Sequence, residues 1–311
     1  MAQSQRCAAH QALAEALERR RSADAGTRTI GLARHFLEAA PSLGIERAVP
    51  FVVAAAERAI ELQAHDQAVQ LLERALGLVD LAGDDGATRI DLLLALGGAC
   101  MRAGDGVRGT AACVQAAKLA RGLGDSERLA RAALAYGERF TFAALDGTLI
   151  ALLQEALEAC GTGATGLRAR LLARLSAALQ PAADPTVPMG LAREAIALAR
   201  EVGDPATRLG VLMAAGSALA YFGDPAERLA IDGELAEIAQ VLGDRIAEAR
   251  ALVRIVFDQL ERGDMHGADA AIDAHASVVE ALRMPSIRSA AALWGRLLCE
   301  ARPARSRLVR G

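Results

Sequence analysis

Five histidines are the residues of this sequence best suited to bind a metal or to transfer protons near neutral pH. A zinc-binding pair on one helix face has the spacing HExxH or HxxxH, and neither spacing occurs. No GxSxG turn surrounds a serine, and no serine or cysteine has a base nearby in the sequence. We therefore interpret the histidines as surface or interface residues, and expect no metal site and no catalytic site. They are His10, His35, His65, His266 and His275.

Two glycine-rich stretches, at 104–109 and 161–166, match the GxGxxG spacing of a dinucleotide-binding loop. Such a loop holds a pyrophosphate only where it follows a β-strand and begins a helix. A predicted helix precedes each stretch here, so we interpret both as turns. A GxxxxGK[ST] loop is absent, and the single lysine, Lys118, lies inside the predicted helical segment AAKLA. The sequence therefore predicts a non-catalytic protein without a cofactor; an enzyme would need residues from distant helices brought together.

Alanine and leucine dominate the 311 residues, which are 53% hydrophobic but only 3% aromatic. Both are strong helix formers, whereas the β-branched and aromatic residues that favour strands are scarce. The sequence therefore predicts an all-α protein. Its net charge of −3 gives no general attraction to nucleic acids or anionic membranes, and no apolar run is long enough to cross a bilayer. Five cysteines without a CxxC pair indicate reduced thiols in a cytoplasmic protein.

A Gly-Asp pair recurs about every 20 residues and is the strongest internal repeat. Glycine favours the left-handed conformation that ends a helix, and aspartate accepts hydrogen bonds from the first amides of the next helix. We therefore expect each pair to separate two helices. After Gly223-Asp224, Pro225 suits the first helical position and Glu227 the position of a capping-box acid. The pairs begin at Gly83, Gly104, Gly124, Gly203, Gly223, Gly243 and Gly263.

Segments of roughly 16 residues with helical spacing of apolar residues lie between these pairs. Short turns between helices of equal length make neighbours antiparallel, so that two helices form a hairpin of about 40 residues that stacks on the next. The stretch 180–189 is expected to be a longer turn within its hairpin. The predicted hairpins span 45–80, 87–122, 126–160, 166–201, 205–241 and 245–282. A helical pair near 4–21 and 28–40 precedes them, and an incomplete unit at 286–300 follows.

The hairpins resemble the tetratricopeptide repeat. Its small and apolar positions are matched in phase by Leu96, Gly97, Cys100, Gly104, Gly109, Cys113 and Ala116. In that repeat the helix A glycine lets helix B of the same hairpin pack closely, and Gly216 and Gly223 repeat the interval of Gly97 and Gly104. The units are nearer 40 than 34 residues and mostly lack the tryptophan and tyrosine of the motif. We therefore expect a divergent tetratricopeptide-like α-solenoid.

The A helices of tetratricopeptide solenoids line the concave face, which implies a binding groove there. Exposed aromatic residues and arginines are favoured at the centres of interfaces. The alternative is that these residues pack between hairpins, because a chain with so few aromatic residues needs them to fill its core. The candidate partner-binding residues are Met101, Arg102, Tyr221, Phe222, Phe257, Leu260 and Glu261.

Residues 35–76 resemble the start of the helical-repeat arm in large bacterial signal-transduction ATPases. These include LuxR-type regulators, maltose-activator-like regulators and nucleotidyl cyclases fused to an ATPase module. Walker motifs, a cyclase domain and a C-terminal helix-turn-helix are absent from the sequence. The resemblance implies a regulatory arm that binds a protein partner or a small inducer in its concave groove and controls a separate or upstream ATPase module. The alternative is a free-standing adaptor that recruits proteins through the same groove.

Three regions follow from these patterns. We expect a helical pair that forms a junction or cap at 1–44, the tetratricopeptide-like solenoid at 45–300, and a tail at 301–311. The tail has four arginines and no acidic residue, so it could contact nucleic acid or an acidic partner. Chain ends are more often disordered and solvated, which is the interpretation we prefer.

Overall fold

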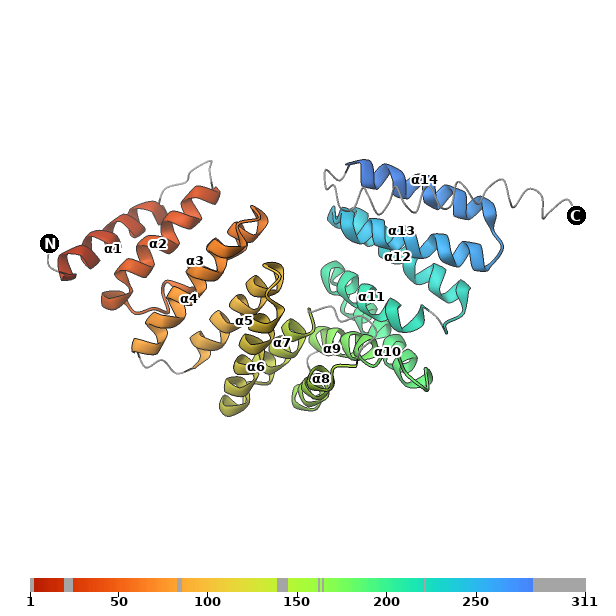
Figure 1. The fold of residues 1–311 in the computed structure, drawn as a ribbon, viewed down its shortest axis with the longest axis horizontal. Helices are drawn as coiled ribbons and strands as arrows, with labels where there is room; N and C mark the ends of the chain where they lie inside the picture. Colours follow the sequence, from red (N-terminus) through yellow and green to blue (C-terminus); the bar gives the residue numbers. More distant parts are fainter. Residues whose placement is uncertain are drawn as a thin grey trace, which may run out of the picture. The chain divides into compact units, whose positions relative to one another are not determined.

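The computed structural model describes residues 3–19, 25–82, 86–138, 145–161, 163, 165–220 and 222–281. Every element within these ranges is an α-helix, which confirms the all-α prediction (Figure 1). The helices are α1 (Gln3–Arg19), α2 (Ala25–Leu43), α3 (Val49–Glu61), α4 (His65–Ala82), α5 (Ala87–Arg102), α6 (Gly106–Leu123), α7 (Ser126–Tyr136), α8 (Gly147–Cys160), α9 (Thr165–Ala178), α10 (Thr186–Val202), α11 (Pro205–Leu219), α12 (Pro225–Leu242), α13 (Arg245–Glu261) and α14 (Met265–Ala281).

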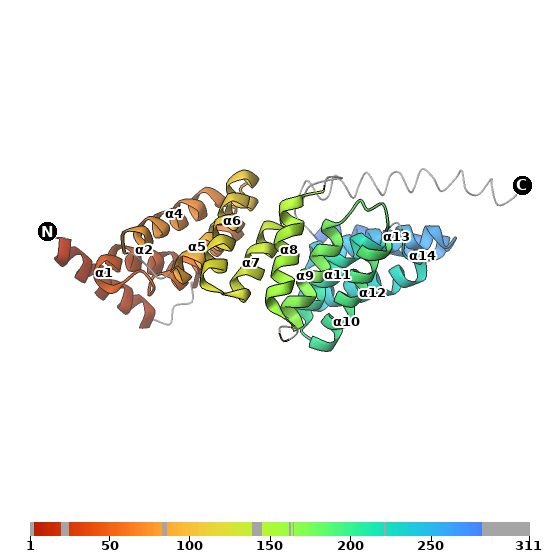
Figure 2. The ribbon, with the colours of Figure 1, turned by 90° about the horizontal axis from the view of Figure 1, so that it is seen from below.

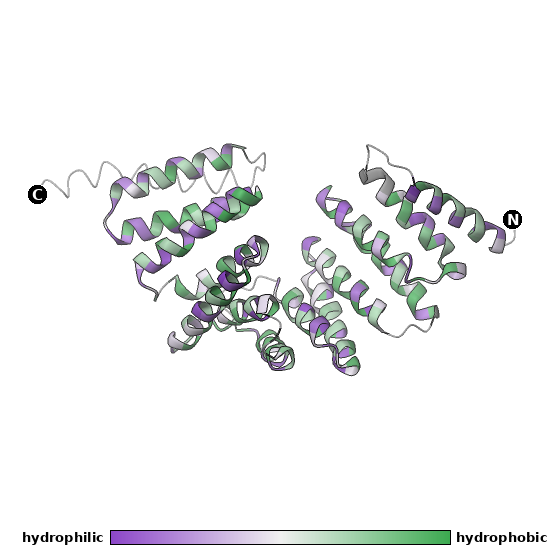
Figure 3. Cartoon of the chain, turned by 180° about the vertical axis from the view of Figure 1, so that it is seen from behind, coloured by the Kyte–Doolittle hydropathy of each residue, from purple (hydrophilic) through white to green (hydrophobic). Residues whose placement is uncertain are grey.

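The chain divides into two compact units, one containing α1–α8 and the other α9–α14. Within each unit a helix packs against the next helix along the chain, and α2, α3, α5 and α9 also contact the helix after that one (Figure 2). Each helix carries both hydrophobic and hydrophilic residues (Figure 3), and its buried residues are mostly alanine, leucine and valine. None of the described helices combines the length and the hydropathy needed to span a bilayer. The helix bounds confirm the predicted hairpins to within a few residues; the unit at 286–300 lies outside the described residues.

The Gly-Asp pairs separate helices as predicted. The side chains of Asp105, Asp125, Asp204 and Asp244 each accept a hydrogen bond from an amide in the first turn of the following helix. The glycines before them adopt positive φ values of 84°, 66°, 74° and 72°. A helix end therefore needs glycine at these positions, because other residues rarely adopt this conformation. The pair that begins at Gly83 lies outside the described residues.

The pair Gly223-Asp224 departs from this prediction in two ways. Gly223 does not have a positive φ; a Cβ there would lie only 2.8 Å from the carbonyl oxygen of Leu219, so glycine is needed for close approach. Asp224 caps α12 and Pro225 begins it, as expected. The capping-box role of Glu227 is wrong, because its carboxylate accepts hydrogen bonds from Arg193 of α10 at 2.7 and 2.8 Å.

Helix α7 is shorter than predicted. It has 11 residues, whereas α6 has 18, so the helices are not of equal length. Its last residue, Tyr136, donates a hydrogen bond from its hydroxyl group to Asp146 at 3.1 Å, and Asp146 caps the N-terminus of α8. The side-chain bond between the end of one helix and the cap of the next thus fixes both ends of the α7–α8 connection.

Helices α5 and α6 approach each other closely through small residues. A Cβ on Gly97 would lie 2.7 Å from the Cys113 sulfur and 3.3 Å from the Gly109 carbonyl oxygen. A Cβ on Gly109 would lie 3.0 Å from the Gly97 carbonyl oxygen. The tetratricopeptide-type role predicted for Gly97 is therefore confirmed. Burial raises the pKa of the Cys113 thiol to about 12, and Cys7, Cys100 and Cys113 form no disulfide.

Ion pairs connect successive second helices of the hairpins, with partners 34 to 36 residues apart. Most of these side chains are substantially exposed, so each pair contributes at most about 1 kcal/mol. Their regular recurrence nevertheless marks which faces of neighbouring hairpins meet. The pairs are Arg74–Glu38, Arg108–Glu73, Arg121–Glu155, Arg193–Glu227 and Arg200–Glu234.

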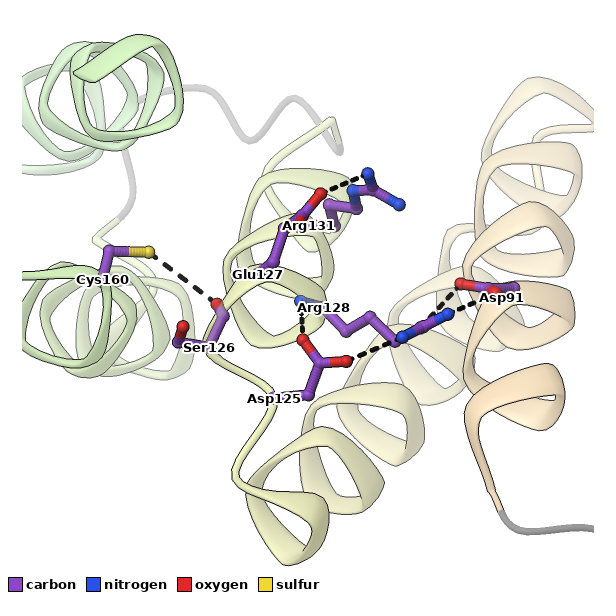
Figure 4. A network of polar contacts seen from close by, with 7 residues as sticks. All are labelled: Asp91, Asp125, Ser126, Glu127, Arg128, Arg131 and Cys160. Carbon is purple, nitrogen blue, oxygen red and sulfur yellow. Dashed lines mark hydrogen bonds and ion pairs between the residues drawn. The ribbon is translucent and has the colours of Figure 1, made fainter. Parts of the chain in front are cut away.

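First helices are joined in a similar way by Arg128 of α7 (Figure 4). Its guanidinium donates to both carboxylate oxygens of Asp91 on α5, at 2.9 and 2.8 Å, and to Asp125 at 2.7 Å. Such a two-pronged contact fixes geometry as well as contributing energy. Arg128 therefore couples the cap of its own helix to the preceding hairpin.

Candidate partner-binding site

The candidate residues of the first unit lie in the last turn of α5. The Met101 side chain is half-buried and covers Gly109 of α6, with its sulfur 3.0 Å from where a Cβ of that glycine would stand. Arg102 is exposed, and its guanidinium lies 4.0 Å from the Glu138 carboxylate. Met101 thus fills space within its own hairpin, while Arg102 lies at the surface.

The candidate residues of the second unit lie in the α11–α12 turn and on α13. Phe222 and Phe257 are 55% and 49% exposed, which is unusual for phenylalanine in a chain so poor in aromatic residues. Leu260 is half-buried and Glu261 is exposed. Tyr221 lies outside the described residues.

The buried guanidinium of Arg228, on the first turn of α12, connects these residues. It donates to the Gly223 carbonyl oxygen at 2.7 Å, to Asp258 at 2.7 Å, and to Glu261. Phe222 precedes Gly223, and Phe257 lies one turn before Glu261 on the same side of α13. One arginine therefore contacts both the α11–α12 turn, which follows Phe222, and the end of α13, which contains Phe257 and Glu261.

Beneath this region lies a cluster of charged residues, three of them buried, which we call the α12–α13 charge cluster: Arg228, Asp232, Arg254, Asp258 and Glu261. Arg228, Asp232 and Asp258 are only 5%, 4% and 4% exposed. Two ion pairs link the helices, Arg228 with Asp258 at 2.7 Å and Arg254 with Asp232 at 3.3 Å. Burying a charge costs several kcal/mol per ion, and only a well-placed partner offsets this cost. Each buried charge of the cluster therefore depends on its ion-pair partner.

Arg254 also corrects the interpretation of Gly216. A Cβ on Gly216 would overlap the Arg254 guanidinium of α13 rather than meet α12. Arg254 also donates to the Met213 carbonyl oxygen at 3.1 Å. Gly216 therefore does not bring helix B of its own hairpin close, as Gly97 does; it makes room for an arginine from the next hairpin.

The acids of the charge cluster are strongly affected by burial. Burial raises the pKa of Asp232 to about 6, and the neighbouring Asp258 adds to the effect, while Arg254 opposes it. Burial also raises the pKa of Asp258, whose oxygen Oδ2 has no hydrogen-bond partner among the described residues. The cluster therefore holds more negative charge than its two arginines satisfy.

The predicted absence of a catalytic or metal site remains a prediction. Among the described residues, no group of three or more His, Cys, Asp or Glu side chains is arranged to hold a metal ion. One histidine contact was not predicted: the Nδ1 atoms of His10 and His35 lie 2.8 Å apart, between α1 and α2. Their sequence separation of 25 hides this pair from any spacing rule.

The charge cluster was not predicted from the sequence either. Its signal was present as two Arg-x-x-x-Asp steps, at Arg228–Asp232 and Arg254–Asp258, each with its polar residues on one helix face. Such steps are ordinarily read as solvated faces. Only the pairing of the two antiparallel helices shows that both steps face each other and are buried.

The chain was compared with protein-family models, curated protein sequences and solved structures. The chain matches no protein-family model and no curated protein sequence. Solved structures do resemble it. The fold is a tetratricopeptide-like α-solenoid of stacked antiparallel helix hairpins.

One similar structure is a Rap protein in complex with competence and sporulation factor, with a TM-score of 0.55 and 10% identity over 96% of this chain and 93% of that one. Another is a signal-transduction ATPase with a tetratricopeptide repeat sensor from Pyrococcus horikoshii, with a TM-score of 0.59 and 14% identity. This match covers 86% of this chain and 43% of the ATPase. At such identities the likeness concerns the fold alone.

Proposed function

We propose that this chain is a non-catalytic helical-repeat scaffold that binds a protein partner through the surface around Arg228. The observation that carries the proposal is that the buried Arg228 bonds to Gly223 and Glu261, which are close in the sequence to the half-exposed Phe222 and Phe257. Aromatic residues at the surface of a well-packed framework are typical of interface centres. The charge cluster fixes the backbone beneath them, so the surface is preorganised, which lowers the entropy lost on binding.

In this proposal the scaffold is the regulatory arm of a cytoplasmic signalling or transcription regulator, whose ATPase module is separate or upstream. The resemblance of residues 35–76 to such arms and the likeness in fold to the repeat sensor of a signal-transduction ATPase support it. A small inducer in the groove would act by changing how the arm meets the ATPase. Nucleic acid and membrane are not among the proposed partners, given the net charge of −3.

A free-standing adaptor is the second candidate. The likeness to the Rap protein, whose structure holds a bound factor, extends over 96% of this chain and favours it. In this case the surface around Arg228 would recruit a protein or peptide without any ATPase. Both candidates use the same surface, so one experiment tests them together.

Site-specific photo-crosslinking tests the proposal. A photoreactive phenylalanine analogue replaces Phe222 or Phe257 in the full chain in its native cells, and replaces Gln240, exposed near the C-terminal end of α12 and about three turns from Arg228, as the matched control. We expect one protein to crosslink at 222 and 257 but not at 240. A P-loop ATPase as the crosslinked protein supports the regulatory arm, and another class of protein supports the adaptor. Equal crosslinking at all three positions, or none at 222 and 257, contradicts the binding surface.

A further inference from the structure

Helix α1 has a weak apolar attachment to the first unit. Among the described helices it packs chiefly against α2 (Figure 1). Its buried hydrophobic residues are Cys7 and Ala14, whereas Leu13 is half-exposed. The ion pair of Glu18 with Arg47, at 3.6 Å, adds little because both side chains are about half exposed. A single polar contact within the α1–α2 interface therefore matters for how firmly α1 is held.

His10 of α1 and His35 of α2 make such a contact. Their Nδ1 atoms are 2.8 Å apart, and their ring centres are 5.0 Å apart. His10 lies one turn from both Cys7 and Ala14, so it is on the face of α1 that meets α2. His35 lies one turn after the buried Leu32. Both histidines are half-buried, so the pair stands within the interface and not on its solvent side.

The contact requires that at least one of the two rings be neutral. A neutral imidazole has one N–H donor and one acceptor nitrogen, whereas an imidazolium has donors only. At a separation of 2.8 Å, one Nδ1 atom must donate to the lone pair of the other. If both rings were protonated, two N–H groups and two positive charges would face each other. The second proton therefore breaks the contact between α1 and α2.

The surroundings of the pair oppose the second proton. Burial lowers the pKa of His35, and the charges of His10 and Arg34 lower it further, while Glu38 opposes them. The charged groups around the pair come from three helices, and α3, which also packs against α2, contributes none. They are Arg6 on α1, Arg34 and Glu38 on α2, and Arg74 on α4.

Glu38 keeps its charge over the range in which histidines titrate. Its carboxylate accepts a hydrogen bond from Arg74 of α4 at 2.6 Å. This bond lowers the pKa of Glu38 below its ordinary value of 4.5. The link between α2 and α4 therefore stays intact in mildly acidic solution, and a pH change there acts on the histidine pair instead.

We propose that the His10–His35 contact makes the attachment of α1 to α2 sensitive to pH: α1 stays attached while one ring is neutral and is released when both are protonated. Because the folded chain lowers the pKa of His35 from 6.5, the stabilisation is complete above about pH 6.5. It is lost as the pH falls through the lowered pKa. The pair lies in the first unit, so this inference does not rest on the proposed function.

Hydrogen exchange of the full chain at about pH 7.5 and about pH 5 tests this proposal. Protection factors, corrected for the intrinsic effect of pH on exchange, compare α1 with α5, a helix of the same unit that contains no histidine. We expect the protection of α1 to fall about tenfold relative to that of α5 at the lower pH, as for the loss of one hydrogen bond. Equal changes in the two helices overturn the proposal.

Substitutions of His10 separate the histidine pair from a general effect of acid. His10→Gln keeps a neutral donor and acceptor, so the pH response of α1 should disappear. His10→Glu should reverse the response, because protonated His35 would then face a carboxylate and α1 would be better protected at the lower pH. His266→Gln, at an exposed histidine of α14, is the matched control and should leave the response unchanged. A response that survives His10→Gln, or that His266→Gln abolishes, contradicts the proposal.

Discussion

Gly97 and Gly216 occupy equivalent sequence positions but serve different purposes. At Gly97, the absent side chain lets the backbone of α6 approach α5 closely. At Gly216, the space is taken by the guanidinium of Arg254, which reaches over from the next hairpin. The first arrangement is apolar and local, and the second is charged and joins two hairpins. One repeat position can therefore strengthen either a hairpin or the junction between hairpins, depending on what fills the space beside the glycine.

The largest difference between the two regions should appear on removal of Arg228. Arg228→Met leaves Asp258 buried without its ion-pair partner, which should lower the unfolding free energy of the second unit by about 3–5 kcal/mol. Urea unfolding monitored by a probe placed in that unit measures the loss. The double variant Arg228→Met with Asp258→Leu should recover most of it, because no uncompensated charge remains. A loss below about 1 kcal/mol for the single variant would mean that the cluster is solvated.

The stability of the α12–α13 charge cluster should depend on pH, whereas that of the α5–α6 interface should not. Because the pKa of Asp232 is raised from 3.8 to about 6, the folded chain holds this proton more tightly than the unfolded chain does. The resulting stabilisation is complete below about pH 4 and is lost as the pH rises through about 6, with an upper size of about 3 kcal/mol.

Unfolding free energies of the wild type and of Asp232→Asn between pH 4 and 8 measure this effect. The variant should lose the part of the pH dependence that belongs to Asp232. The α5–α6 interface should contribute little over this range, because its buried thiol, Cys113, has a pKa of about 12. Identical pH profiles for the wild type and the variant would show that Asp232 is not buried in solution.

Alanine at the two glycines tests the comparison directly, with a smaller expected effect. Gly97→Ala places a methyl group 2.7 Å from the Cys113 sulfur and should cost about 1–3 kcal/mol in any background. Gly216→Ala displaces Arg254, so its cost should depend on that residue.

In an Arg254→Ala background, Gly216→Ala should become neutral or stabilising by up to about 1 kcal/mol, because alanine is the better helix former. A double-mutant cycle by urea unfolding gives the coupling between the two positions. A cost for Gly216→Ala that is the same with and without Arg254 would remove the distinction between the two glycines.

The smallest effect is expected at the ion pairs between second helices. Arg193→Gln breaks an exposed bidentate pair with Glu227 and should cost no more than about 1 kcal/mol, and less at high salt. Thermal unfolding at low and high ionic strength measures it. A cost near that of Arg228→Met would mean that these pairs, and not the buried cluster, hold the second unit together.

The sequence predicts the helices well because their boundaries depend on local contacts. Asp105 and Asp125 cap helices through amides only three residues away. The prediction for Glu227 is wrong because Arg193, 34 residues earlier, competes for its carboxylate. The role of Gly216 was missed for the same reason, since Arg254 lies in another hairpin.

The candidate site could be predicted only in part. Phe222, Phe257 and Glu261 were named from their positions on the hairpins; of these, Glu261 contacts Arg228, and their role in binding stays a prediction. Arg228 itself was missed, because its importance depends on burial, which the Arg-x-x-x-Asp spacing does not reveal.

The order of charges in the α12–α13 cluster has a consequence for how the two helices are aligned. The pairs are of opposite polarity: α12 contributes the arginine to one and the aspartate to the other. If α13 slipped by one turn along α12, either Arg254 would face Arg228 or Asp258 would face Asp232. Both slips place like charges together away from water. An alanine-rich interface alone would tolerate several alignments of α13 along α12. The four charged side chains stabilise only one of them.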